Sequence, residues 1–129
     1  MRTAGCAGLE RVVCCGHVRL VEKIARDGAD GVRIEVHRTL PPVLRELKQD
    51  GYRLIGLEQA TGSQCLYAYP FHRRTALVIG NERLGLTEQE LRLMDDVVEI
   101  PVYGLPYAYN VATAAALAMY EYCRQWPNG

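Results

Sequence analysis

The sequence predicts an α/β domain with a mostly parallel sheet and flanking helices. Short apolar runs alternate with amphipathic segments along its 129 residues, and this alternation is typical of right-handed βαβ units. The composition, 49% hydrophobic and 23% charged, is that of an ordinary globular protein. At this length we expect one domain over residues 1–129, large enough to bury a sizeable core.

The first expected strand and the two elements after it follow from local patterns. Residues 11–15 form an apolar run that Gly16 closes, which indicates a buried strand. Residues 18–26 place apolar side chains at helical spacing. Residues 32–36 alternate Val and Ile with Arg and Glu, which suits a half-exposed strand.

The middle of the chain predicts a helix, a strand and a loop. Residues 40–50 carry two prolines in their first turn and are followed by Gly51. Proline near the start and glycine past the end are what helix termini permit. Residues 52–57 form the next expected strand, and residues 58–63 are polar enough to be a loop.

Four elements are expected in the last third of the chain. Residues 76–79 form a fully apolar strand, and residues 87–94 form a helix whose threonine and later glutamate make a capping box. Residues 97–100 form a short strand, and residues 110–125 form an alanine-rich final helix. Strand and helix therefore alternate throughout, and the strands are expected to pair in parallel.

The start of the chain is unusual for this fold class. Residues 1–5 have the character of a helix that leads into the first strand, whereas an α/β domain normally opens with a strand. We therefore expect that the chain begins at an internal methionine, and that the first strand and its ligand-facing turn are missing.

Composition and cysteine spacing exclude several classes of protein. No apolar run approaches the roughly 20 residues that span a bilayer, so no membrane partner is expected. The five cysteines form no C-x-x-C pair, which argues against a metal site or disulfides and favours a reducing cytoplasm. Fifteen basic residues balance fifteen acidic ones, so any RNA contact must come from local patches.

Residues 76–125 are where a ligand site is expected. Two apolar strands there each end in a turn made of Gly, Asn, Pro and Glu, and each turn leads toward a helix. Parallel strands place such turns at one edge of a sheet, where α/β proteins bind ligands. We expect the turns at Gly80, Ile100 and Tyr109 to converge on a single cleft.

Three blocks of residues carry a resemblance to a known family. They are R-T-A with a later Gly8 and V-V within 2–13, G-N-E followed by Gly85 within 80–85, and I-P, Gly104, N-V, Y-E and R-Q within 100–125. Together they resemble the SpoU (TrmH) branch of the SPOUT RNA methyltransferases.

The resemblance implies a fold and an activity. The fold would be an α/β sheet with a deep trefoil knot at the C-terminus, and the chain would be a SPOUT methyltransferase domain. The activity would be transfer of a methyl group from S-adenosylmethionine to a ribose 2′-hydroxyl of tRNA or rRNA, without a metal. The alanine-rich last helix would help to build the knot and a homodimer.

The resemblance also assigns site residues. Four positions should line the pocket of the methyl donor: Leu57, Gly80, Ile100 and Tyr109. Arg2 would bind an RNA phosphate and assist loss of the 2′-proton, which matters because a ribose hydroxyl is a poor nucleophile at neutral pH. Glu82 would help to fix the catalytic loops, or would be a plain carboxylate near a helix N-terminus. Asn110 would serve the site and could also be a simple N-cap.

Two departures from the family pattern keep alternatives open. Ala108 stands where the family has a serine, and the asparagine that precedes the motif-one arginine would lie upstream of Met1. The chain could therefore be a non-catalytic domain that binds RNA or S-adenosylmethionine. A generic nucleotide-binding α/β module is a third reading, although no G-x-G-x-x-G or phosphate-loop lysine motif is present.

Overall fold

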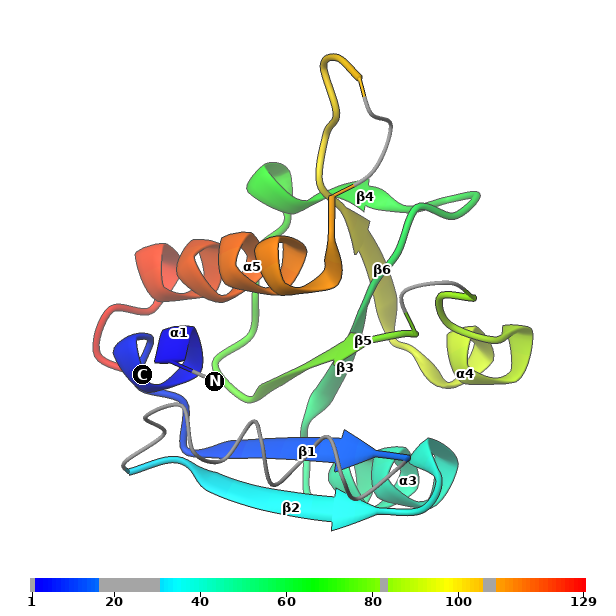
Figure 1. Ribbon diagram of the computed structural model, residues 1–129, viewed down its shortest axis with the longest axis vertical. Coiled ribbons are helices and arrows are strands. Elements are labelled where there is room, and N and C mark those ends of the chain that lie inside the picture. The colour runs from blue at the N-terminus through cyan, green and yellow to red at the C-terminus, as the bar shows by residue number, and fades with distance from the viewer. Residues whose placement is uncertain (1, 17–30, 82–83, 106–108) are drawn as a thin grey trace. The chain divides into compact units, whose positions relative to one another are not determined.

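The computed structural model describes residues 2–16, 31–81, 84–105 and 109–129 (Figure 1). The chain divides into two compact units, Met1–Val43 and Leu44–Gly129. The expected helix over 18–26 lies outside the described residues. The other expected helices and strands are all present, with boundaries that differ by at most one residue at either end.

The first unit pairs two strands beside a short helix. Helix α1 (Arg2–Cys6) precedes β1 (Arg11–Cys15), which pairs in parallel with β2 (Arg33–His37). Across the two strands the guanidinium of Arg11 donates to the carboxylate of Glu35. This hydrogen bond holds the pKa of Glu35 below its ordinary value. Helix α3 (Leu40–Gln49) begins in this unit and continues into the next.

The second unit is built on a four-stranded sheet in which all neighbouring strands are parallel. Its strand order is β4-β6-β3-β5. The strands are β3 (Arg53–Leu57), β4 (Gln64–Cys65), β5 (Thr75–Ile79) and β6 (Asp96–Glu99). Because the four strands run in the same direction, their C-terminal ends lie at a single edge of the sheet, as the sequence predicts.

Two helices and one short turn complete the second unit. Helix α4 (Glu88–Leu93) starts at the expected capping box, in which Thr87 accepts from the N–H of Glu90 and the Glu90 carboxylate accepts from the N–H of Thr87. Helix α5 (Val111–Gln125) contacts β5 and the 3-10 helix η1 (Leu66–Ala68). The sequence patterns assigned no element to β4 or η1, because two or three residues show no period.

The core of this unit lies between α5 and the sheet. Ile55, Val98 and Ala118 are completely buried in it. Further residues of α5 pack against this cluster while remaining partly exposed: Ala114, Leu117 and Tyr122. Burial of this apolar face fixes α5 against the strands, and so places the first turn of the helix beside their C-terminal ends.

Candidate functional site

A cavity of about 280 Å³ opens at the C-terminal ends of three parallel strands. The last residue of each strand lines it: Leu57 of β3, Ile79 of β5 and Glu99 of β6. Val111 and Ala114 line it from the first turns of α5. Apolar walls at the carboxyl edge of a parallel sheet are the usual setting of a ligand site in this fold class.

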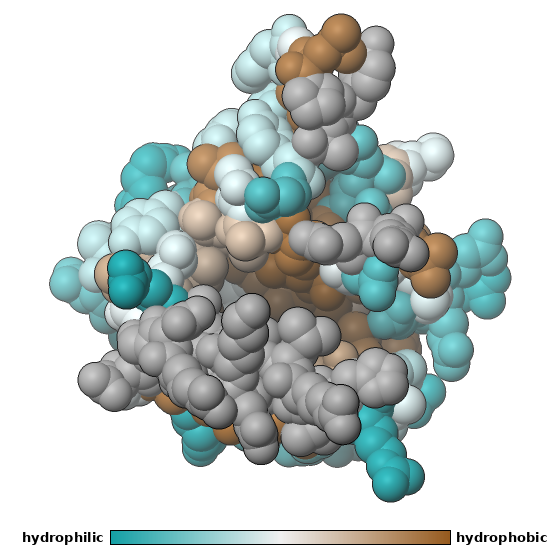
Figure 2. All heavy atoms as spheres, viewed as in Figure 1, coloured by the Kyte–Doolittle hydropathy of each residue, from teal (hydrophilic) through white to brown (hydrophobic). Residues whose placement is uncertain are grey.

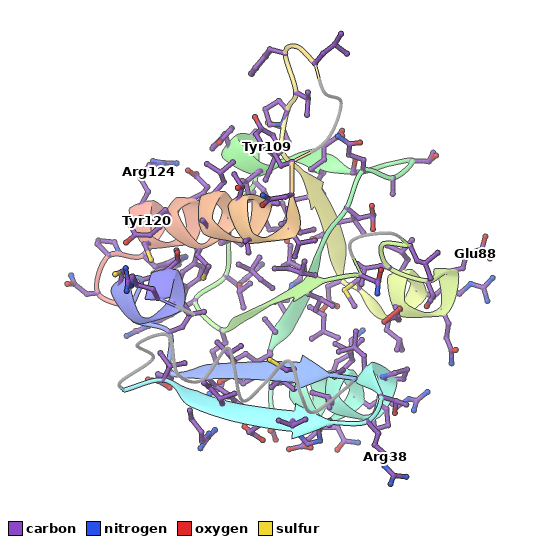
Figure 3. All side chains as sticks on the ribbon, viewed as in Figure 1. Arg38, Glu88, Tyr109, Tyr120 and Arg124 are labelled. Atoms are coloured by element: carbon purple, nitrogen blue, oxygen red, sulfur yellow. The ribbon has the colours of Figure 1, made fainter. Side chains whose placement is uncertain are left out.

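The residues expected to hold the methyl donor lie together in this cavity. Leu57, Gly80, Ile100 and Tyr109 all line it. Leu57 and Ile100 are buried, whereas Tyr109 is 44% exposed and precedes Asn110, the N-cap of α5 (Figure 3). The turns after β5 and β6 and the entry to α5 therefore converge. The roles of these residues toward a donor remain predictions.

A close approach of two backbones shapes the turn after β5. A Cβ atom at Gly80 would lie 2.2 Å from the carbonyl carbon of Gly85, so only glycine fits there. The N–H of Gly85 donates to the carbonyl of Asn81 at 2.7 Å, which closes the turn. The proximity of Gly85 is therefore a structural reason for glycine at position 80, beside its predicted place in the donor pocket.

Glu58 braces the same turn from the end of β3. Its carboxylate accepts from the N–H of Leu86 at 2.8 Å. Gly85 has a φ of +64°, and a Cβ atom there would lie 2.2 Å from Oε2 of Glu58. The position therefore demands glycine both for its backbone conformation and for its space. One wall of the cavity thus depends on a single carboxylate and a single glycine.

Asn110 is an N-cap in the structure. Its side-chain oxygen accepts from the N–H of Thr113 at 2.8 Å, at the start of α5. It also lines a second cavity of about 420 Å³, to which Tyr103 and Thr113 contribute as well. Tyr109 lines both cavities. Asn110 therefore has the expected capping role, and its place in the wall of the second cavity is compatible with a further role.

The remaining expected site residues are less defined. Arg2 is an exposed residue of α1 in the first unit, and its catalytic role stays a prediction. Glu82 lies outside the described residues, as does Ala108.

Sequence reasoning missed both carboxylates of the cavity, Glu58 and Glu99. Glu58 follows β3 directly, and Glu99 ends β6. A usable signal was present, since both stand where parallel strands were expected to end at the ligand edge. Glu58 falls in the expected polar loop over 58–63 and Glu99 in the expected strand over 97–100, and neither pattern by itself indicates a binding role.

The described residues contain no group of three or more His, Cys, Asp or Glu side chains that could hold a metal ion. None of the five cysteines, all of which lie in the described ranges, forms a disulfide. Within the same described ranges, no helix is long and apolar enough to cross a membrane.

Comparison with known proteins decides the family. The family model of the SpoU rRNA Methylase family matches residues 1–120. The chain belongs to this family. Membership of the SpoU family sets aside a generic nucleotide-binding module, and the α/β fold with a parallel sheet and flanking helices is the one expected from the sequence.

Curated relatives of this SpoU chain act on two kinds of RNA, according to their names. A tRNA (guanosine(18)-2′-O)-methyltransferase of Escherichia coli strain K12 is 28% identical over 99% of this chain and 57% of its own length. A 23S rRNA (guanosine-2′-O-)-methyltransferase of Bordetella pertussis is 30% identical over 97% of this chain and 53% of its own. The chain thus spans about half the length of these relatives.

Solved structures of the family share the fold. The A. aeolicus TrmH/SpoU tRNA modifying enzyme is 25% identical, with a TM-score of 0.85 over 98% of this chain and 66% of its own. The SpoU methyltransferase AviRb from Streptomyces viridochromogenes, solved in complex with the cofactor AdoMet, is 26% identical, with a TM-score of 0.83 over 99% of this chain and 52% of its own.

Proposed function

We propose that this chain is an S-adenosylmethionine-dependent RNA methyltransferase that modifies a ribose 2′-hydroxyl of tRNA or rRNA. The observation that carries the proposal is the cavity at the ends of β3, β5 and β6, because it is lined by all four residues expected to hold the donor. Membership of the SpoU family and the names of the curated relatives support the same activity.

The cavity suits the chemistry of the donor. Leu57, Ile79 and Ile100 offer apolar walls for an adenine ring, and Tyr109 is placed to cover that ring by stacking. Gly80 and Gly85 also line the cavity, and their missing side chains let the turn after β5 fold closely on itself and against Glu58. When bound, S-adenosylmethionine supplies a methyl group on a positively charged sulfur.

The protein's own contribution is positioning and proton removal. Holding the acceptor hydroxyl in line with the methyl group removes much of the entropic barrier. Arg2 would bind an RNA phosphate and assist loss of the 2′-proton, and Glu82 and Asn110 would fix the loops around the reacting groups. These roles come from the family resemblance.

We take residues 1–129 to be a single SPOUT domain with the C-terminal trefoil knot, working in the cytoplasm.

A homodimer is supported by the large apolar side chains exposed in the loops, Leu84, Tyr103 and Leu105. Figure 2 shows hydrophobic atoms at the tip of the segment between β6 and α5. Sedimentation equilibrium would distinguish a dimer from a monomer.

Two measurements test the activity. Calorimetry with S-adenosylmethionine should show binding, and Tyr109→Ala should weaken it by about 1–3 kcal/mol because a stacked base is lost. Tyr120→Ala is the matched control, since Tyr120 is half exposed and lies farther along α5 (Figure 3). A chain that bound neither the donor nor its demethylated product would refute the proposed pocket.

Transfer itself is tested with a tritium-labelled donor and total tRNA or rRNA as acceptor. Label in ribose 2′-O-methyl nucleotides after digestion is the expected result. Donor binding without transfer would favour the alternative, a non-catalytic domain that binds RNA or S-adenosylmethionine. Ala108, in place of the family serine, is the residue that favours this alternative.

A further inference from the structure

The charged side chains among the described residues that line the cavity are all acidic. Two of the described residues that line it are glutamates, Glu58 and Glu99, and none of them is a lysine or an arginine. Glutamate side chains carry a negative charge at neutral pH. A ligand in this cavity therefore meets negative charge from the ends of two adjacent strands, β3 and β6.

Glu58 is already committed to the protein. Its carboxylate accepts from the N–H of Leu86 at 2.8 Å, and its Oε2 occupies the space beside Gly85. A carboxylate that already accepts a hydrogen bond from a backbone N–H and supports a turn is less free to turn toward a ligand. Replacing Glu58 would also disturb the wall, so it is a poor probe of charge.

Glu99 is not committed in this way. Glu99 is partly exposed and lines the cavity, and its carboxylate forms no hydrogen bond or ion pair with any described residue. Apolar side chains line the same cavity, among them Leu57, Ile79 and Ile100. An unpaired carboxylate against apolar walls exerts a stronger field than one surrounded by water, because the local dielectric constant is lower.

We propose that Glu99 makes this cavity discriminate the positively charged methyl donor from the uncharged product. The inference rests on the proposed function. S-adenosylmethionine and S-adenosylhomocysteine share the adenosine, the ammonium and the carboxylate. They differ by one methyl group and by the positive charge on sulfur. An unpaired carboxylate in the wall attracts that charge in the donor and loses the attraction once the sulfur is a neutral thioether.

This discrimination would help turnover. The product keeps nearly all the apolar contacts of the donor, so apolar contacts alone would hold both about equally. A charge in the wall favours entry of the donor and release of the product. Glu99 is then a specificity-determining residue, and it is distinct from the groups expected to act on the RNA.

Calorimetry with the two purified ligands tests the proposal. The unmodified chain should bind S-adenosylmethionine more tightly than S-adenosylhomocysteine. Glu99→Gln should weaken donor binding about five- to tenfold and product binding less than about twofold, because only the donor loses a charge–charge attraction. Glu88→Gln is the matched control, since its side chain is 90% exposed on α4 (Figure 3) and should leave both affinities unchanged.

The outcomes separate the two proposals. If Glu99→Gln leaves the ratio of the two affinities unchanged, the role of Glu99 is refuted while the donor pocket stands. If the unmodified chain binds neither ligand, the proposed function and this inference both fall. Glu99→Asp keeps the charge and should keep the preference; loss of the preference in that variant would also count against the proposal.

A second measurement does not depend on the folding of a variant. Added salt screens attraction between charges, so a salt titration of the unmodified chain should weaken donor binding more than product binding. Equal weakening of the two ligands would overturn the inference even if Glu99→Gln failed to fold.

Discussion

The side-chain amide of Gln125 pairs with the backbone around Phe71 as a neighbouring strand would. Its Oε1 accepts from the N–H of Phe71, and its Nε2 donates to the carbonyl of Tyr69, both at 2.8 Å. The indole N–H of Trp126 donates to the carbonyl of Phe71 at 2.7 Å. The buried Glu121 accepts from Nε2 of Gln125 at 3.0 Å, which fixes the amide. The last turn of α5 therefore holds the segment that leads into β5.

Gln125→Ala should lower the free energy of unfolding by about 1–3 kcal/mol, because it leaves two backbone groups without partners in a half-buried setting. Urea unfolding followed by the fluorescence of Trp126, the single tryptophan, measures it. Gln89→Ala, at an exposed position of α4, is the control. Equal effects of the two changes would show that the Gln125 amide contributes nothing.

These contacts mark the limit of what local patterns predict. The helix that ends at Gln125 and the strand that begins at Thr75 follow from apolar periodicity and turn residues. The pairing of Gln125 with Phe71 joins residues 54 positions apart. No period in the sequence reports such a pairing, because it depends on how the elements pack.

The candidate site likewise has features that the sequence predicts and features that it does not. Convergence of Gly80, Ile100 and Tyr109 could be predicted because parallel strands end at one edge of a sheet. The contact of Gly80 with Gly85, and the use of Glu58 as a brace, could not be predicted. Both depend on the exact path of a turn, which apolar patterns do not describe.

Gly85→Ala should disrupt the cavity, and it should destabilise the protein more than the same substitution in an uncrowded turn does. The new Cβ atom would strain a φ of +64° and would lie 2.2 Å from the Glu58 carboxylate. Gly62→Ala is the matched control, with a φ of +82° and nothing within 4 Å of the added atom. We expect about 1 kcal/mol of destabilisation for the control.

For Gly85→Ala we expect a larger loss of stability and a loss of donor binding, measured by thermal unfolding and calorimetry. If both alanine variants lost the same stability and kept donor affinity, the contact between Gly85 and Glu58 would not shape the cavity.

Asn110 permits a separation of its two roles. Serine is about as good an N-cap as asparagine, whereas alanine costs about 1 kcal/mol. Asn110→Ser should therefore keep the stability of the protein, and Asn110→Ala should lower it. If the amide also serves the reaction, both variants should lose methyl transfer to RNA. Full transfer by Asn110→Ser would leave Asn110 as a helix cap alone.

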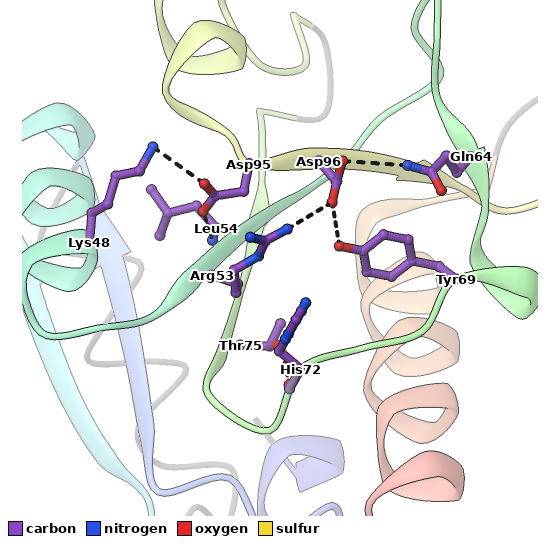
Figure 4. A network of polar contacts seen from close by, with 9 residues as sticks. All are labelled: Lys48, Arg53, Leu54, Gln64, Tyr69, His72, Thr75, Asp95 and Asp96. Atoms are coloured by element: carbon purple, nitrogen blue, oxygen red, sulfur yellow. Dashed lines mark hydrogen bonds and ion pairs between the residues drawn. The ribbon is translucent and has the colours of Figure 1, made fainter.

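The carboxylate of Asp96, at the start of β6, accepts hydrogen bonds from three side chains (Figure 4). The phenol of Tyr69 donates to its Oδ2 at 2.6 Å and Arg53 to the same oxygen at 3.3 Å, while Gln64 donates to Oδ1 at 3.4 Å. Burial of the phenol, together with its hydrogen bond to Asp96, raises the pKa of Tyr69 to about 12. The folded protein therefore binds this phenolic proton more tightly than the unfolded chain does.

Alkaline pH should reveal this proton in a comparison with Tyr69→Phe. Below about pH 10, the ordinary value for tyrosine, both states of Tyr69 are protonated and its contribution to stability is complete. As the pH rises from about 10 through about 12, the unfolded chain releases the proton first, so the contribution is lost. The unmodified protein should thus lose its stability advantage over Tyr69→Phe across this window, by about 2 kcal/mol.

Urea unfolding at pH 9 and at pH 11.5 measures the difference, and comparison with the variant removes the effect of the other seven tyrosines. An advantage that stayed constant between the two pH values would show that the phenol of Tyr69 titrates alike in both states.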